Sequence, residues 1–339
     1  MKRNLNLDLI KGLCILFILI DHFTGWTSAT RLSALFPYWI TMAVPLLMVV
    51  LGYLYAMSYQ RHGINTLRKA YSFRQLRDRF IRYTIPFIMA YSIELIISSI
   101  DNGFFSIFPL WLKDFFTGGW GAGSYYYPIL LQFMFFFPII FFLILRYDLI
   151  GLGICLLMNI AYEIVHWLIQ MPPSVYRLLL FRYTLLIAFG CYILIGKRKF
   201  KWAERIISLI LGAFFIWLFN YTSYQPVILC NWTTTSFPTA FFVLPIALWL
   251  IQLFLPKNAF SSLIALLGRA SYNIFLTQMV YFNYAAARIM KYIHLPNISL
   301  CLLNIIICCF MGCLFYYFED KFTKRILAFI HKKESPVNA

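Results

Sequence analysis

NLDLIKGLCILFILIDHF, residues 6–23, is an apolar stretch that carries four ionisable side chains, Asp8, Lys11, Asp21 and His22. Its length and hydrophobicity are those of a membrane-spanning helix, which needs about 20 mostly apolar residues. A charged side chain near the centre of a span costs roughly 2.5–3.5 kcal/mol, so such side chains usually face a cavity or a partner. The stretch therefore predicts a membrane helix with ionisable side chains that face a cavity or a partner.

The composition of the whole chain is that of a membrane protein. Of its 339 residues, 62% are hydrophobic and 12% are charged, which lies outside the usual range of soluble domains. The net charge of +17 could indicate a nucleic-acid partner, but the basic residues form short clusters between apolar runs, and we expect none. The eight cysteines form no CxxC or Cys/His ligand pattern, so we expect neither a disulfide nor a metal site.

Ten apolar segments are long enough to be membrane-spanning helices. They cover residues 8–26, 38–58, 83–100, 125–145, 149–169, 177–195, 206–224, 237–255, 271–289 and 299–318. Most Lys and Arg residues fall in connections that would be cytoplasmic if both termini were inside, which favours that orientation. The sequence predicts an all-α polytopic membrane protein with one membrane domain, 1–320. A basic cytoplasmic tail, 321–339, could form an interfacial helix.

Helical geometry groups three of the four ionisable residues of the first helix. At about 100° per residue, Asp8, Lys11 and His22 project within a sector of roughly 60°, whereas Asp21 points about 100° away from His22. His22 follows Lys11 by eleven residues, about 16 Å of helical rise. Two interpretations stay open: the polar face lines a cavity, or Asp8 and Lys11 form an interfacial ion pair while the other two residues mark the outer end.

The first helix resembles that of acyltransferase family 3, a family of polytopic membrane acyltransferases. Its members share a basic residue, ten intervening residues and a histidine, which Lys11 and His22 match, with Asp8 in the acidic position. Further segments also resemble the family: VPLLMVVLGYLYA (44–56), RDRFIRYTIPF (77–87), GSYYYPILLQFMFFFP (123–138), FRYTLLIAFGCYI (181–193) and LGRASYNIFLTQMVYF (267–282). The last of these often ends in a histidine, where this chain has Gln278.

The resemblance implies transfer of an acyl group, commonly acetyl, from cytoplasmic acyl-CoA as the donor substrate, with no bound cofactor. The acceptor would be a hydroxyl of a surface glycan or lipid-linked saccharide. The protein would lie in the bacterial inner membrane, in contact with membrane lipid. His22 would be the general base, since an alcohol must lose its proton as it attacks. Lys11 could pair with Asp8, orient the helix or hold an anionic part of the donor.

Three arginines at the start of the predicted third helix, Arg77, Arg79 and Arg82, are candidates for binding the donor. Coenzyme A carries phosphates, which arginine side chains bind well. Arg79 and Arg82 are three residues apart and share a helix face. The alternative is that all three are ordinary basic residues of a cytoplasmic loop.

Other polar residues inside predicted spans are further cavity candidates. Glu163 and His166, three residues apart, could line the same cavity or make a structural contact. Arg182 needs a carboxylate or carbonyl partner, and Glu163 is a candidate. Gln132 and Gln278 are more typical of hydrogen bonds between helices.

A membrane transporter or flippase for a saccharide or lipid-linked precursor is the alternative function. Intramembrane charges also relay protons or bind substrates in transporters. A transporter favours repeated halves with paired, broken helices, and the sequence has no clear pattern of that kind.

Overall fold

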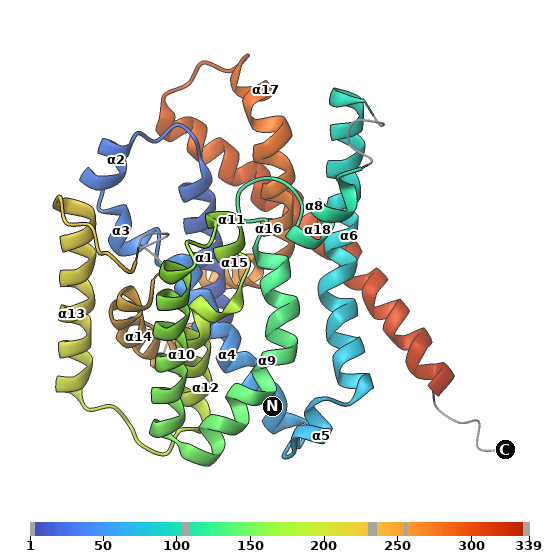
Figure 1. Ribbon diagram of the computed structural model, residues 1–339. Helices are drawn as coiled ribbons and strands as arrows, with labels where there is room; N and C mark the ends of the chain where they lie inside the picture. The colour runs from blue at the N-terminus through green and yellow to red at the C-terminus, as the bar shows by residue number, and fades with distance from the viewer. Residues whose placement is uncertain (1–3, 104–108, 230–235, 254–255, 335–339) are drawn as a thin grey trace. The chain divides into compact units, whose positions relative to one another are not determined.

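The computed structural model describes residues 4–103, 109–229, 236–253 and 256–334, which contain helices and no strands (Figure 1). This confirms the predicted all-α class. The contacts divide the chain into unit 1, Met1–Ala70 with Phe135–Arg269, and unit 2, Tyr71–Met134 with Ala270–Ala339. The end of the predicted eighth span, 254–255, and the end of the predicted tail, 335–339, lie outside the described residues.

Unit 1 contains the first helix and most of the middle of the chain. Its helices are α1 (Leu5–His22), α2 (Ser28–Ser33), α3 (Phe36–Trp39), α4 (Ala43–Arg61), α5 (Leu67–Ala70), α10 (Leu149–Leu168), α11 (Pro173–Tyr176), the 3-10 turn η1 (Leu180–Tyr183), α12 (Thr184–Ile195), α13 (Trp202–Tyr221), α14 (Phe237–Gln252) and α15 (Ala259–Arg269). Helix α9 (Tyr126–Tyr147) begins in unit 2 and continues in unit 1 from Phe135. Within unit 1, α1 packs on α15 and α4, α4 on α12, and α13 on α14.

Glycines let α4 and α12 pack backbone to backbone. A Cβ atom on Gly52 would lie 2.1 Å from the Ile187 carbonyl oxygen, and one on Gly190 would lie 1.9 Å from that of Val49. Small residues at such crossings allow membrane helices to approach closely. The two glycines lie in the segments 44–56 and 181–193, which resemble acyltransferase family 3. Close packing of the two helices is a physical reason for a glycine in each segment.

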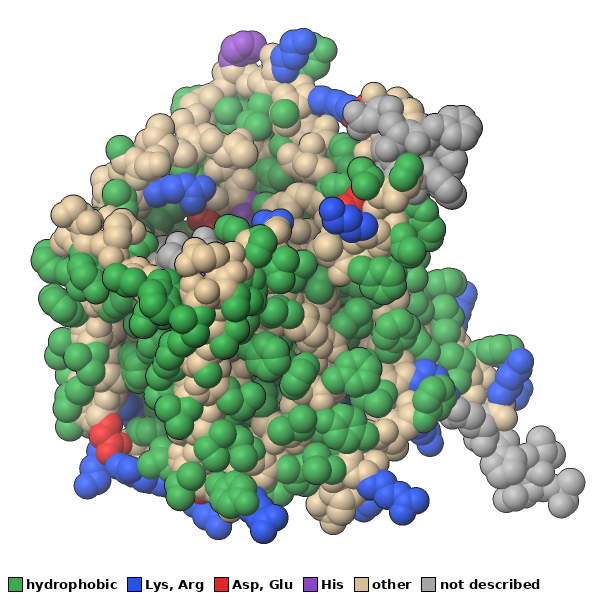
Figure 2. Space-filling model, in the orientation of Figure 1, with side chains coloured by type: hydrophobic (Ala, Val, Ile, Leu, Met, Phe, Trp, Pro, Cys, Tyr) green, Lys and Arg blue, Asp and Glu red, His purple; other side chains and the backbone are tan. Residues whose placement is uncertain are grey.

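The outer face of α13 is apolar. Figure 2 shows hydrophobic side chains over most of this helix, with Lys and Arg side chains near its N-terminal end. Ile207, Ile210, Leu211 and Phe214 on α13 are all exposed. An apolar helix with an exposed apolar face is expected to contact lipid.

Unit 2 is built on α6, α16 and α18, which pack on one another. Its helices are α6 (Phe73–Asn102), α8 (Trp111–Thr117), α16 (Ser271–Val280), the π-helical turn η3 (Tyr281–Ala285), α17 (Ala286–Met290) and α18 (Asn297–Glu334).

Helix α18 joins the predicted last span and most of the predicted tail in one helix. The buried Glu319 accepts hydrogen bonds from Asn273 (3.2 Å) and Thr323 (2.5 Å). His331 Nε2 lies 2.9 Å from the Asp78 carboxylate. The helical tail thus contacts both α16 and α6, and its position at a membrane interface stays a prediction.

The structure supports fewer spans than the ten predicted. Among the described residues, six helices are long and apolar enough to cross a membrane: Phe36–Arg61, Leu67–Asp101, Tyr126–Tyr147, Leu149–Leu168, Trp202–Tyr221 and Asn297–Lys333. The broken pair Ala259–Arg269 and Ser271–Met290 would make a seventh. The helices at Leu180–Ile195 and Phe237–Gln252 are short, and α1 carries Asp8, Lys11 and Asp21 within its 18 residues. The ten-span topology and its orientation therefore remain predictions.

Candidate functional site

The continuous helix α1 holds the Asp8–Lys11 pair near its start. Asn4 caps the helix by accepting a hydrogen bond from the Asn6 backbone N–H at 3.0 Å. Asp8 lies in the first turn, where the helix dipole stabilises a negative charge. Lys11 Nζ lies 3.0 Å from Asp8 Oδ1, and the Asp8 side chain is buried. The predicted pairing of these two residues is therefore present.

Helix α15 fixes the position of this pair. A Cβ atom on Gly12 would lie 2.1 Å from the Ile264 carbonyl oxygen, and one on Gly268 would lie 1.8 Å from the Asp8 carbonyl oxygen. The two backbones are thus in direct contact beside Asp8 and Lys11. Close packing of this kind leaves α1 little freedom to rotate or slide.

His22 is the last residue of α1 and is half-buried. Trp26 of the following loop and Arg31 of α2 hold this end of the helix. Arg31 Nη1 lies 2.6 Å from Asp21 Oδ1, and its Nη2 donates to the Asp21 carbonyl at 2.6 Å. Trp26 Nε1 donates to the Ile20 carbonyl at 3.0 Å. Asp21 thus has a structural partner, which leaves Asp8, Lys11 and His22 as the functional candidates of the helix.

The three candidate arginines lie on α6 with different surroundings. Arg77 pairs with Asp78 at 3.0 Å, and its guanidinium carbon lies 5.7 Å from the centre of the Phe73 ring. Arg79 is half-buried and Arg82 is exposed. All three belong to unit 2 and α1 belongs to unit 1, so a shared site for them stays a prediction.

A buried cluster in unit 1 brings together Glu163, His166 and Arg182. Each of these side chains is at most 2% exposed. Tyr176 connects them: its hydroxyl donates to Glu163 Oε1 at 2.7 Å, its ring centre lies 5.2 Å from the Arg182 guanidinium carbon, and the His166 ring packs edge-on against it with 4.4 Å between centres.

Sequence reasoning missed Tyr176. The residue lies in the connection between two predicted spans, after Pro172 and Pro173, and the shortness of this connection was the only signal that it returns to α10. Burial raises the pKa of the Tyr176 hydroxyl, and the positive charge of Arg182 lowers it in part. The hydroxyl therefore stays protonated and acts as the donor to Glu163.

Unit 2 holds a buried carboxylate that the sequence analysis did not single out. Glu94 on α6 is 2% exposed and accepts a hydrogen bond from the Trp120 backbone N–H at 3.2 Å. The signal was present in the sequence, since Glu94 lies inside the predicted span 83–100 and an ionisable residue in a span is a functional candidate by default.

The two glutamines of unit 2 bond to backbone carbonyls. Gln132 donates to the Pro128 carbonyl of its own helix at 3.3 Å, and the fully buried Gln278 donates to the Ala122 carbonyl at 3.0 Å. Gln278 thus ties α16 to the loop before α9. Across the described ranges, no three His, Cys, Asp or Glu side chains are grouped as a metal site would require.

Comparison with known proteins identifies a family for the chain. The family model described as an acyltransferase domain, that of acyltransferase family 3, matches residues 4–328. Neither the curated proteins nor the solved structures gave a match to the chain.

Proposed function

Because the chain belongs to acyltransferase family 3, we propose that it transfers an acyl group, acetyl in the simplest case, from acyl-CoA to a hydroxyl of a surface glycan or lipid-linked saccharide. The match over residues 4–328 carries this proposal, since it covers nearly the whole chain, including α1, α6 and the buried cluster around Tyr176. The protein would act within the bacterial inner membrane, with the donor arriving from the cytoplasm.

In this proposal His22 is the general base. Its imidazole removes the proton of the acceptor hydroxyl as the oxygen attacks the thioester carbonyl. A C–O bond forms, the C–S bond breaks, and the proton passes to the departing thiolate of coenzyme A. The position of His22 at one end of α1 supports the role, because a half-buried imidazole there can meet an acceptor that arrives from outside the helix bundle.

Lys11 and Asp8 lie toward the other end of the same helix, about 16 Å and about 21 Å of helical rise from His22, respectively. We assign Lys11 a positioning role, in which the ammonium group, held 3.0 Å from Asp8, presents positive charge toward the anionic donor. Asp8 keeps that charge in place. Arg79 and Arg82 would bind the phosphates of coenzyme A, for which guanidinium groups are well suited.

One experiment separates an acyltransferase from a transporter. The purified chain in lipid vesicles is given radiolabelled acetyl-CoA and a saccharide acceptor, and the ester formed and the free coenzyme A are both counted. An acyltransferase yields equal amounts of each. Movement of the saccharide across the vesicle membrane without consumption of acetyl-CoA would favour a transporter and refute the proposed acyl transfer.

A further inference from the structure

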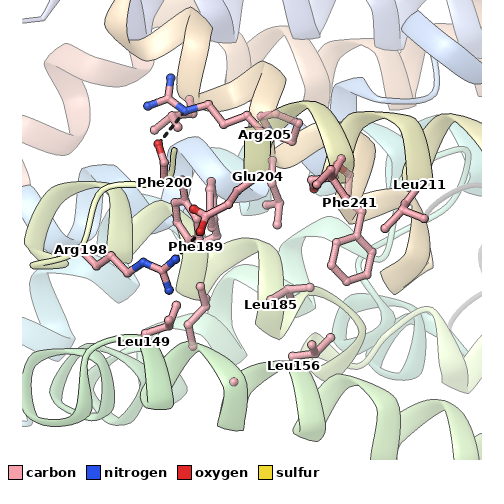
Figure 3. A pocket seen from close by; sticks show the side chains of 17 residues that line it. Leu149, Leu156, Leu185, Phe189, Arg198, Phe200, Glu204, Arg205, Leu211 and Phe241 are labelled. Carbon is pink, nitrogen blue, oxygen red and sulfur yellow. Dashed lines mark hydrogen bonds and ion pairs between the residues drawn. The ribbon is translucent and has the colours of Figure 1, made fainter. Parts of the chain in front are cut away.

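Unit 1 contains a cavity of about 500 Å³ between α10, α12, α13 and α14, apart from the candidate site (Figure 3). Its volume lies in the range of about 300–1,000 Å³ that is usual for ligand pockets. Its walls are mainly leucine and phenylalanine side chains, among them Leu152, Leu156, Leu185, Phe189, Leu211 and Phe241. A lining of this kind favours a hydrocarbon ligand.

The polar groups of the wall bond to each other. Pro245 on α14 has no backbone N–H, so the carbonyl of Phe241, four residues earlier, loses its usual helical partner. The Ser208 hydroxyl on α13 donates to this carbonyl at 2.7 Å. Because the Ser208 hydroxyl and the Phe241 carbonyl bond to each other, this part of the wall offers no hydrogen-bonding group to a polar ligand. It therefore favours an apolar ligand.

One end of the cavity is charged. Arg198, Glu204 and Arg205 line this end, and Figure 3 shows Arg198 and Glu204 pointing toward one another. Arg198 forms an ion pair with Glu204, and Arg205 donates to the Phe200 carbonyl at 3.2 Å. Arg198 and Arg205 thus bring two guanidinium groups to this end of the cavity, and guanidinium groups bind phosphate well.

The cavity adjoins the lipid-facing side of α13. Ile207 and Leu211, which line it, are both 58% exposed. From Glu204 to Leu211 the helix rises by about 10 Å, so an acyl chain lying along α13 would keep its headgroup at the charged end. Entry from the bilayer favours a resident lipid over a ligand that arrives from water.

We propose that this cavity binds one acyl chain of an anionic membrane phospholipid, with the phosphate of that lipid between Arg198 and Arg205.

The charged end of the cavity lies on the side of unit 1 where α1 begins. Arg205 donates a hydrogen bond to the Gln252 side chain at 3.4 Å, and the nearby Leu253 carbonyl accepts one from the Asn6 side chain. This lipid site does not depend on the proposed acyl transfer.

The test is photolabelling of the full chain in nanodiscs with phosphatidylglycerol that bears a diazirine in its acyl chain. Labelled peptides are identified by mass spectrometry. Gly153 offers a precise way to fill the cavity, because it lines the wall and a Cβ atom on it meets nothing within 4 Å. We expect labels on α10, α12, α13 and α14, and loss of most of this labelling in Gly153→Phe.

Charge variants test the headgroup. Arg198→Gln with Arg205→Gln should weaken phosphatidylglycerol labelling by about fivefold for each guanidinium removed. The matched control is Lys199→Gln with Lys201→Gln, which removes the same charge from exposed neighbours that do not line the cavity and should leave labelling unchanged. The comparison of these two double variants tests the headgroup site even if Gly153→Phe folds poorly.

Three results would overturn the lipid site. Labelling of the four helices could persist in Gly153→Phe, phosphatidylcholine could label them as strongly as phosphatidylglycerol, or a diazirine-bearing long-chain acyl-CoA could label them where phosphatidylglycerol does not. The last result would assign the cavity to the acyl donor.

Discussion

The hydroxyl of Tyr176 donates a hydrogen bond of 2.7 Å to the carboxylate of Glu163 in the interior of unit 1. The same tyrosine ring packs against Arg182, which lies on the next element of the chain. Helix α10, the short helix α11 and the turn η1 are therefore joined through one side chain. Since the connection between α10 and α11 is short, this contact closes a compact helical hairpin.

Tyr176→Phe should destabilise the protein. The substitution keeps the ring and removes the donor, which leaves the buried Glu163 carboxylate with one fewer hydrogen bond at a cost of about 1–3 kcal/mol. The measurement is the thermal unfolding midpoint in detergent. Tyr224→Phe, at an exposed tyrosine of the same unit, is the control and should not change the midpoint. Equal midpoints for the two variants would show that the Tyr176–Glu163 hydrogen bond does not stabilise the protein.

Gly12→Ala should disturb the packing of α1 on α15. The added methyl group would lie 2.1 Å from the Ile264 carbonyl oxygen, so the helices must separate, at a cost of about 1–3 kcal/mol. Gly153→Ala is the matched control, because the same methyl group on α10 meets open space. Unfolding midpoints in one detergent compare them, and a Gly12→Ala protein as stable as Gly153→Ala would contradict the close packing.

The Asp8–Lys11 pair should show a coupled response. Lys11→Met leaves the buried Asp8 carboxylate without its cation, so we expect lower stability, and adding Asp8→Asn should restore about 0.5–3 kcal/mol of it. Acyl transfer should stay low in the double variant, because the charge offered to the donor is gone. Full activity in the double variant would reduce the pair to an ordinary structural contact.

Arg79→Gln with Arg82→Gln should weaken acyl-CoA binding by about 100-fold or more, since each of the two charge-assisted contacts to phosphate contributes about 1.5–3 kcal/mol. Equilibrium binding of acetyl-CoA to the purified chain measures this. Arg74→Gln is the control, because Arg74 is an exposed arginine of the same helix with no assigned role. Unchanged affinity in the double variant, or equal loss in the control, would remove these arginines from the donor site.

The positions of the helices were largely predictable from the sequence. Which of these helices are long enough to span a membrane was less predictable. Hydropathy placed each of the ten segments on a helix, because long apolar runs in this chain have few other ways to satisfy their backbone groups. It overstated the α-helix within 177–195, where the α-helix is Thr184–Ile195 and follows the 3-10 turn Leu180–Tyr183, and within the described part of 237–255 the helix ends at Gln252. An apolar run can include a turn or a loop, and hydropathy does not distinguish these from helix.

Contacts along one helix were predictable, and contacts between elements were not. The Asp8–Lys11 pair follows from a spacing of three residues in a helix. The Asp21–Arg31 pair and the Tyr176–Glu163 bond depend on how the short helices α2 and α11 return to α1 and α10. That return is set by tertiary packing, and no local pattern in the sequence records it.

Removal of the His22 imidazole tests whether this side chain is the general base of acyl transfer. Purified His22→Ala in lipid vesicles is compared with the intact chain and with His294→Ala, which removes an exposed histidine outside the proposed site, and acyl ester formation from acetyl-CoA is measured. We predict that His22→Ala loses about 10²–10⁴-fold in rate, as expected for loss of a general base, while His294→Ala keeps full activity and both variants unfold at the temperature of the intact chain. Acyl transfer by His22→Ala at the rate of the intact chain would show that His22 is not the general base.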